Sequence, residues 1–380
     1  MRASHFVWSD ATGWTGDPAA RARANLVIYF GGRSALSNSA RFDEMRVIFP
    51  TAHILGCSGG GQIYNNDVLD KEIVAVAISF DNTRLKLVRK PIASSEDSGI
   101  CGAAIGQALA AEDLAGVFVL SDGLKVNGSA LVAGIAGAAG SRIPITGGMA
   151  GDDASFTDTL VGADDAPRHG RVAAVGFYGS SIRFSHGCAG GWDVFGPRRR
   201  ITKAHGNVLL ELDGEPALDL YERYLGEEDA KGLPGTALLF PLQICNPEHR
   251  EANVVRTVLA VDRDNRSMTF AGDVPQGWTA QLMRGNFDRL SAGAADAARQ
   301  AHQGVGDVES VAILVSCIGR RLLMGQRIGD EVEAAGAELG GKTLRLGFYS
   351  YGEISPHAAS GVSELHNQTM TVTAFHEIAG

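Results

Sequence analysis

Residues 344–377 concentrate the side chains that are best suited to recognising a small molecule. They hold two tyrosines, a glutamate, a histidine and an asparagine, namely Tyr349, Tyr351, Glu353, His366 and Asn367. A carboxylate accepts hydrogen bonds from an amine, a tyrosine offers an apolar ring with a polar tip, and a neutral imidazole hydrogen-bonds a ligand or binds a metal ion. Polar groups at the ends of rigid strands are what a ligand site requires. We therefore predict a ligand site in this stretch.

Two further residues, at and just after the end of the apolar run 310–317, extend this candidate site. Arg320 carries a planar guanidinium that matches a carboxylate, so it could clamp a ligand carboxylate; the alternative is an internal ion pair with Glu353. Cys317 ends the same run and is either a small buried residue or, together with His366, a nucleophile. No third residue that would orient the histidine is evident. We therefore predict that Arg320 and Cys317 bind a ligand and do not catalyse a reaction.

The tyrosines and histidines also have purely structural alternatives. Tyr349 and Tyr351 lie two residues apart, so on a strand both would point to one face, either as a pocket wall or as a half-buried sheet face. His366 either reaches a ligand or holds the loop before the last strand. Three further histidines stay open as candidates, namely His53, His186 and His205.

Two glycine-rich segments look like phosphate-binding loops but lack the required residues. The segment GCSGGGQ at 56–62 has no Gly-Lys-Ser/Thr, and GGMAGDD at 147–153 is not followed at once by a predicted helix. Cys57 in the first segment lacks the Gly-x-Ser-x-Gly turn of a nucleophile elbow. We expect these glycines to let strands cross closely.

A recurring order of elements positions the candidate residues. Apolar runs predict strand, helix, strand, glycine-rich turn, long loop and strand, in that order, three times along the chain. The predicted strand, helix, strand and last strand of each copy are 25–30, 40–48, 52–56 and 72–80; 116–120, 129–139, 143–146 and 171–178; and 310–317, 329–339, 344–350 and 370–375. In the third copy the alternating sequences LRLGFYSY and TMTVTAF predict half-buried strands, separated by a loop of about 15 residues.

These patterns predict an α/β (α+β) fold with mixed sheets flanked by helices and repeated strand–helix–strand–hairpin units. Further strands are predicted between the second and third copies, among them 236–244, and Pro216 marks the first turn of a helix at 215–225. The charged, glycine-rich segment 226–235 resembles a linker. We therefore predict two domains, 1–226 and 227–380.

Composition excludes several classes of function. The chain has 380 residues, 45% of them apolar, and a net charge of −9, so nucleic acid is not an expected partner. No apolar run approaches the roughly 20 residues that span a bilayer, and the N-terminus lacks the apolar segment of a signal peptide, so we expect a soluble, cytoplasmic protein without a membrane partner. Five widely spaced cysteines argue against a disulfide framework and against a zinc site.

Several motifs, in this order, are similar to those of FIST proteins, which are sensory modules with an N-terminal and a C-terminal FIST domain. The motifs are GCSGGGQI at 56–63, GGMAGDD at 147–153, ELDGEPALDLYERYLG at 211–226, FPLQI at 240–244, GDVPQGW at 272–278, SCIGRR at 316–321, FYSYGEI at 348–354 and LHNQTM at 365–370. They are spread over nearly the whole chain.

The resemblance implies a protein that binds a small ligand and does no catalysis of its own. It would signal through a separate partner, such as a histidine kinase or a cyclic-dinucleotide enzyme, because no fused output segment is evident. The chain is also similar to the NosP branch, which implies an alternative: a sensor of nitric oxide that holds haem b, with His366 as the metal ligand. Otherwise the cofactor is unknown. A hydrolase that uses Cys317 or Cys57 is the remaining alternative.

Overall fold

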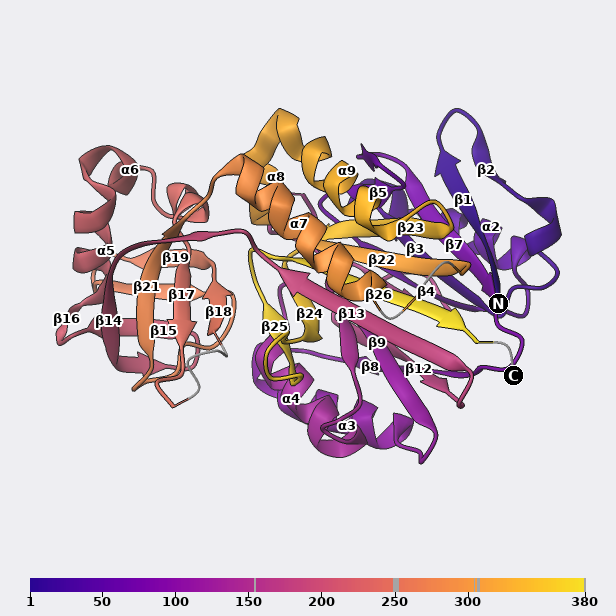
Figure 1. The fold of residues 1–380 in the computed structure, drawn as a ribbon, viewed down its shortest axis with the longest axis horizontal. Coiled ribbons are helices and arrows are strands. Elements are labelled where there is room, and N and C mark those ends of the chain that lie inside the picture. The colour runs from indigo at the N-terminus through magenta and orange to yellow at the C-terminus, as the bar shows by residue number, and fades with distance from the viewer. Residues whose placement is uncertain (154, 249–252, 304, 306–307, 379–380) are drawn as a thin grey trace.

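Three copies of one strand–helix–strand–strand unit build the larger body of the molecule (Figure 1). The computed structural model describes all residues except 154, 249–252, 304, 306–307 and 379–380. The first two strands of each unit are parallel, and the first and last are antiparallel. The units are β3 (Leu26–Gly31), α1 (Arg33–Leu36), α2 (Ala40–Ile48), β4 (His53–Ser58) and β7 (Ile73–Ser79); β9 (Leu114–Ser121), α4 (Gly128–Ala139), β10 (Ile145–Met149) and β12 (Arg171–Tyr178); and β22 (Ser310–Cys317), α8 (Ile318–Met324), α9 (Ile328–Leu339), β23 (Thr343–Ser350) and β26 (Met370–Glu377). This topology confirms the predicted repeat and the predicted α/β fold class.

A further strand extends each of the three sheets beyond its last strand, and helices cover their outer faces. These strands, β1, β8 and β13, pair with β7, β12 and β26, respectively, and β2 follows β1 at the edge of the first sheet. Helix α3 packs beside α4 over the second sheet, and α7 packs beside α9 over the third. The bounds of these and the remaining short elements are β1 (Arg2–Ser9), β2 (Gly13–Gly16), η1 (Pro18–Ala20), β6 (Asp67–Leu69), β8 (Arg84–Pro91), η2 (Ser95–Asp97), α3 (Ser98–Leu109), β13 (Ile182–Ala189), α7 (Phe287–His302) and η4 (Gly325–Arg327).

Each copy also lends a short strand to the sheet of a neighbouring copy. Strand β5 (Gln62–Tyr64) of the first copy pairs with β23 of the third, β11 (Val161–Ala163) of the second pairs with β4 of the first, and β24 (Gly352–Pro356) of the third pairs with β10 of the second. Strand β24 also forms a hairpin with β25 (Ser363–His366). The predicted loop between Ser350 and Met370 is therefore wrong, because its strands form through pairing with a distant part of the chain.

Main-chain hydrogen bonds close a ring where the three second strands end. The amide of Gly60 donates to the carbonyl of Tyr349 at 2.8 Å, that of Gly151 to Ser58 at 2.9 Å, and that of Tyr351 to Met149 at 3.2 Å. Each bond joins a different pair of copies. The three glycine-containing turns are thus parts of one junction and bind one another.

One glycine in each second strand permits this close packing. Gly56, Gly147 and Gly347 each lie beside the first strand of their own copy. A Cβ atom at any of the three would clash with the carbonyl oxygen of the paired residue, which is Tyr29, Val119 or Leu314. For Gly56 and Gly147 this agrees with the expectation that the two glycine-rich segments let strands approach closely, and Gly347 plays the same part in the third copy.

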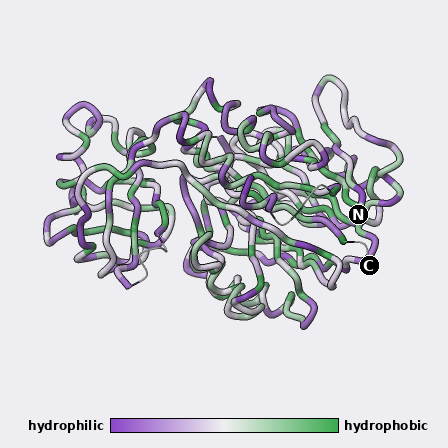
Figure 2. Tube along the Cα trace, viewed as in Figure 1, coloured by the Kyte–Doolittle hydropathy of each residue, from purple (hydrophilic) through white to green (hydrophobic). Residues whose placement is uncertain are grey.

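The central strands are buried on both faces. Every residue of β3, β12 and β22 is buried. Their inner faces form one core to which all three copies contribute, including Phe30, Phe118 and Phe348. The rings of Phe30 and Phe348 stack with centroids 4.5 Å apart. Figure 2 shows hydrophobic residues concentrated along these strands, and full burial of each such ring contributes on the order of 2 kcal/mol.

The prediction that β26 is half-buried is wrong. Thr371 and Thr373, the polar members of its alternating pattern, are only 3% and 2% exposed. Helix α7 packs over this strand and excludes water from its outer face. The hydroxyl of Thr371 is satisfied by the carbonyl of Val315 at 3.3 Å.

A separate eight-stranded sheet is inserted between β13 and α7, ahead of the third copy. It forms the smaller body at the left of Figure 1. Its first and last strands pair with each other, so that Asp193 lies opposite Arg284 and the chain enters and leaves at one place. The inserted elements are β14 (Asp193–His205), β15 (Val208–Leu212), β16 (Glu215–Pro216), α5 (Ala217–Leu225), α6 (Glu227–Lys231), η3 (Gly235–Leu239), β17 (Leu242–Cys245), β18 (Asn253–Arg256), β19 (Val258–Asp262), β20 (Ser267–Phe270) and β21 (Thr279–Arg284).

Two predictions concern the inserted sheet. A strand over 236–244 is only partly correct, because its first half is the 3-10 helix η3. The predicted domain boundary at residue 226 falls between α5 and α6, within the inserted sheet, and stays a prediction.

Within the described part of the chain, no helix is both long and apolar enough to cross a bilayer.

Candidate functional site

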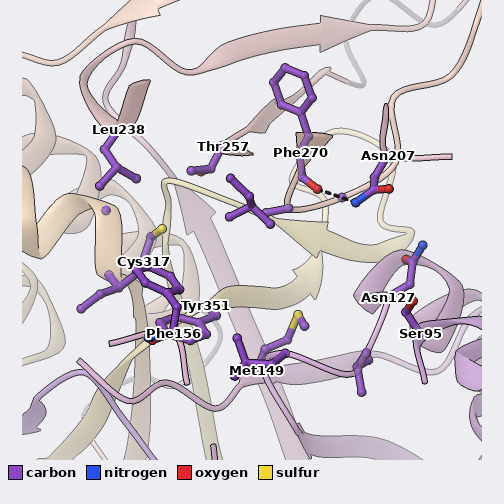
Figure 3. Close-up of a pocket in the computed structure, with 18 residues that line it drawn as sticks. Ser95, Asn127, Met149, Phe156, Asn207, Leu238, Thr257, Phe270, Cys317 and Tyr351 are labelled. Carbon is purple, nitrogen blue, oxygen red and sulfur yellow. Dashed lines mark hydrogen bonds between the residues drawn. The ribbon is translucent and has the colours of Figure 1, made fainter. Parts of the chain in front are cut away.

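A cavity of about 230 Å³ lies between the three-copy body and the inserted sheet (Figure 3). Both bodies line it, as do the second and third copies. The lining residues are Ser95, Gly123, Leu124, Val126, Asn127, Met149 and Phe156 from the second copy and the segment before it; Cys317, Ile318, Gly319 and Tyr351 from the third; and Asn207, Leu238, Thr257, Leu259, Phe270, Ala271 and Gly272 from the inserted sheet. The cavity is thus the place where a bound molecule would touch all of these parts.

Tyr351 lies at the cavity because the chain leaves its strand there. Strand β23 ends at Ser350, and the following bend leads into β24. The two-residue spacing therefore does not bring Tyr349 to the cavity. Tyr349 is fully buried under the guanidinium of Arg321, which lies 5.5 Å above its ring. Of the two predicted tyrosines, one lines the cavity.

An aromatic pair forms one wall of the cavity. The ring of Phe156 stacks on that of Tyr351, with centroids 4.7 Å apart and planes inclined by 15°. Asp152 holds this arrangement, because its carboxylate accepts hydrogen bonds from the amides of Phe156, Thr157 and Asp158 and from the Tyr351 hydroxyl. Burial, followed by the hydrogen bond to Asp152, raises the pKa of Tyr351. Tyr351 is therefore a neutral hydroxyl bound to a carboxylate.

The polar groups of the cavity carry no charge. Asn127 donates to the carboxylate of Asp273 at 2.9 Å, and Asn207 donates to the carbonyl of Phe270 at 2.8 Å. The hydroxyl of Thr257 is buried and has no hydrogen-bond partner among the described residues. Figure 3 shows Thr257 and Leu238 on the side opposite Met149. An unpaired buried hydroxyl costs free energy, and the amide of Asn367 outside the cavity is also without a partner among the described residues.

Arg320 forms an internal ion pair, but not the predicted one. Its guanidinium binds Glu331 with nitrogen–oxygen distances of 2.7 and 2.9 Å, and both side chains are fully buried. It also donates to the carbonyls of Gly190 and Leu290. The prediction that Arg320 pairs with Glu353 is wrong. Glu331, on helix α9 of the same copy, binds the guanidinium instead. No donor of Arg320 is directed at the cavity lining.

Glu353 is fully buried, and no described residue forms an ion pair with it. Its carboxyl accepts hydrogen bonds from the hydroxyl of Ser350 at 2.7 Å and from the amide and hydroxyl of Thr369 at 3.1 and 2.9 Å. Burial raises the pKa of Glu353 to about 8, although these hydrogen bonds oppose the rise. The residue ties β24 to the start of β26 and does not line the cavity.

His366 and Asn367 lie in the hairpin behind the cavity. The Nε2 atom of His366 lies 3.0 Å from the carbonyl oxygen of Ser355, so this nitrogen carries the proton. Burial lowers the pKa of His366 to about 3, which keeps the ring neutral. The amide of Asn367 is fully buried, and neither of its polar atoms has a hydrogen-bond partner among the described residues. Neither residue lines the cavity.

These positions do not fit haem. None of the described residues that line the cavity is a histidine. His366 lies outside the lining of the cavity, and the guanidinium of Arg320, which suits a propionate, forms an ion pair with Glu331. Across the described part of the chain, no three His, Cys, Asp or Glu side chains gather closely enough to hold a metal ion.

The cysteines are not activated as nucleophiles. Cys317 lines the cavity, but burial raises the pKa of its thiol, as it does for Cys57. No contact between either thiol and a histidine is found among the described residues. All five cysteines are free thiols.

Sequence reasoning missed most of the cavity. Thr257, Asn127 and Asn207 are ordinary residue types in unremarkable surroundings, and no spacing links them. Gly272 begins the GDVPQGW motif. That motif is the feature of the sequence that could have indicated the cavity wall formed by the inserted sheet.

Comparisons with known proteins agree with the motifs. A model of the FIST N domain matches residues 25–215, and a model of the FIST C domain matches residues 217–356. An uncharacterized protein of Methanocaldococcus jannaschii is 28% identical over 218 residues, which are 53% of this chain and 40% of that protein. The chain thus spans about two fifths of that relative's length.

A solved structure, cyanuric acid hydrolase from A. caulinodans, aligns with 100% of this chain and 99% of its own at 9% identity and a TM-score of 0.37. A likeness at this level carries no argument. The two domain models decide the question: the chain belongs to the FIST family, whose domains are associated with the sensing of small ligands in signal transduction.

Proposed function

We propose that this protein is a sensor that binds a small molecule in the cavity between its two bodies and has no catalysis of its own. The observation that carries the proposal is the lining, which comes from the second copy, the third copy and the inserted sheet together. A ligand that touches both bodies stabilises one arrangement of them. A change of arrangement is what a separate partner can detect.

The signal would pass to another protein, such as a histidine kinase or a cyclic-dinucleotide enzyme. The family association with signal transduction supports this step. The test is to measure autophosphorylation of a candidate kinase with the protein alone and with the protein saturated by a ligand found in the screen below. A rate that is the same in both mixtures for every candidate kinase and cyclic-dinucleotide enzyme tested would count against this output.

The binding proposal is tested by blocking the cavity from each side. Leu124 and Leu259 line it from opposite bodies, and their side chains are 41% and 47% exposed, so a larger residue is tolerated at either position. A library of small fragments is screened against the wild-type protein by ligand-detected NMR. We expect fragments that bind the wild type to be lost in both Leu124→Trp and Leu259→Trp.

Leu322→Trp is the matched control, because Leu322 is 44% exposed and lies outside the cavity. Fragments that bind the cavity should bind this variant as they bind the wild type. Fragments that still bind both Leu124→Trp and Leu259→Trp occupy another part of the protein. If every hit behaves in that way, or if the screen yields no hit, the cavity is not a ligand site.

A further inference from the structure

We propose that the cavity takes an uncharged, compact molecule that has an apolar body and a hydroxyl, carbonyl or amide group to pair with Thr257. This inference rests on the proposed function and names the class of ligand. It differs from the prediction drawn from the sequence, in which Arg320 would clamp a carboxylate.

The charge of the lining limits which molecules the cavity can hold. No described residue that lines the cavity carries a formal charge. The carboxylates just behind the lining are already paired: Asp273 accepts from Asn127, and Asp152 accepts from Tyr351 and a run of amides. An ionised ligand would lose its hydration here without meeting an opposite charge, which is strongly unfavourable.

The cations near the cavity are likewise unavailable. The guanidinium of Arg256 lies behind Gly272 and donates to the carbonyls of Asp273, Val255 and Leu365. Burial lowers the pKa of Arg256 to about 10, so the group stays charged at neutral pH but is enclosed by acceptors. Arg320 is bound to Glu331. A carboxylate or phosphate would therefore meet no charged side chain of opposite sign among the described residues that line the cavity.

The volume and the apolar lining of the cavity favour a compact ligand. The volume of about 230 Å³ lies just below the roughly 300–1,000 Å³ that is common for ligand sites. Most of the wall is apolar and includes Met149, Leu238, Phe156 and Ile318. A compact molecule with an apolar body fills such a space without leaving polar groups unpaired.

The hydroxyl of Thr257 indicates which polar group the ligand would carry. This residue lies between β18 and β19, and its carbonyl accepts from the amide of Ala271 at 2.9 Å, which holds the backbone in place. The hydroxyl itself is unpaired and buried against the protein, so it would reach a ligand after the side chain rotates about its Cα–Cβ bond. Because a hydroxyl both donates and accepts, a carbonyl, amide or hydroxyl on the ligand would satisfy it. Asn127 and Asn207 each keep a second amide hydrogen for further contacts.

The test uses three probes of nearly equal shape: benzamide, which is neutral, benzoate, which is an anion, and benzamidine, which is a cation at neutral pH. Binding to the full-length protein is measured by ligand-detected NMR titration. We expect benzamide to bind at least about tenfold more tightly than either ion. Leu124→Trp should abolish this binding and Leu322→Trp should not.

Thr257→Val then tests the hydroxyl, because valine keeps the shape and removes the oxygen. We expect benzamide to bind about tenfold more weakly to this variant, with Thr257→Ser restoring affinity. The melting temperature of Thr257→Val should not fall, which separates lost contact from lost fold.

Each other result overturns the inference. If benzoate or benzamidine binds the cavity as tightly as benzamide, the ligand class is wrong while the proposed function stands. If benzamide binds Leu124→Trp or Thr257→Val with the same affinity as the wild type, it does not bind as proposed. If no probe binds at millimolar concentration, the class is also wrong, and the fragment screen above decides independently whether the cavity binds any ligand.

Discussion

The interior of the third copy and the cavity beside it are built from opposite kinds of side chain. The interior holds ionisable groups with buried partners, such as Arg320 with Glu331 and Glu353 with Thr369. The cavity holds neutral groups, among them an unpaired hydroxyl. Chemically distinctive residues thus hold this fold together, while inconspicuous residues form the space that a ligand can enter. Substitutions in either region can test this division.

Removal of the buried guanidinium should have the largest effect. Arg320→Ala leaves the carboxylate of Glu331 buried without a countercharge, so we expect the free energy of unfolding to fall by about 3–5 kcal/mol. Urea unfolding measures the change. Replacing both partners, as in Arg320→Met with Glu331→Leu, should recover part of the loss. If Arg320→Ala is as stable as the wild type and no longer binds cavity ligands, Arg320 belongs to the site instead.

Glu353 should make stability depend on pH. Its pKa is about 8 in the fold and 4.5 ordinarily, so between these values the folded state holds a proton that the unfolded state has released. Stability therefore falls by several kcal/mol as pH rises from 4.5 to 8. Urea unfolding at several pH values should show this slope in the wild type and a flatter one in Glu353→Gln. Parallel curves for the two proteins would mean that Glu353 is ionised in the fold.

Thr257→Val should stabilise the ligand-free protein. The substitution removes a buried hydroxyl that has no partner, and such a group costs about 1–3 kcal/mol. Urea unfolding should therefore give a higher midpoint than for the wild type, together with the weaker ligand binding described above. As a control, Thr371→Val removes a hydroxyl that is bonded to Val315 and should not stabilise the protein. A loss of stability in Thr257→Val would show that its hydroxyl has a partner.

The smallest effect is expected at the aromatic wall. Phe156 is 45% exposed and stacks on Tyr351, so Phe156→Ala should cost about 0.5–1.5 kcal/mol of stability. A bound ligand should dissociate faster from this variant, because one wall of the cavity is lost. Relaxation-dispersion NMR on the bound ligand measures that rate. An unchanged rate would indicate that the ligand does not touch the aromatic pair.

The repeated elements could be predicted from the sequence because their signals are local. Helix α2 and strands β12 and β22 have the predicted bounds, and each copy contains its strand and helix in the predicted order. Apolar runs flanked by glycine and polar residues are sufficient for this. The pairing of β24 with β10 was not predictable in this way, because the partner lies in another copy and the segment carries glycine and proline.

The site was less predictable than the fold. Of the residues predicted to bind a ligand, Cys317 and Tyr351 line the cavity. The residue types of Arg320, Glu353 and His366 suggest ligand binding, but each side chain forms its hydrogen bonds with other parts of the fold. Thr257 could not be found from the sequence, because what marks it is the absence of a partner in three dimensions.

The exchanged strands and the inserted sheet differ in how freely evolution can change them. Each copy supplies an edge to another copy, so the three form an interlocked ring from which no member can be deleted without exposing a sheet edge. The inserted sheet instead begins and ends on paired strands, with Asp193 opposite Arg284. The whole inserted sheet could therefore be replaced through two neighbouring chain junctions, at Asp193 and Arg284. Because it forms one wall of the cavity, such an exchange would retune ligand preference while leaving the ring intact.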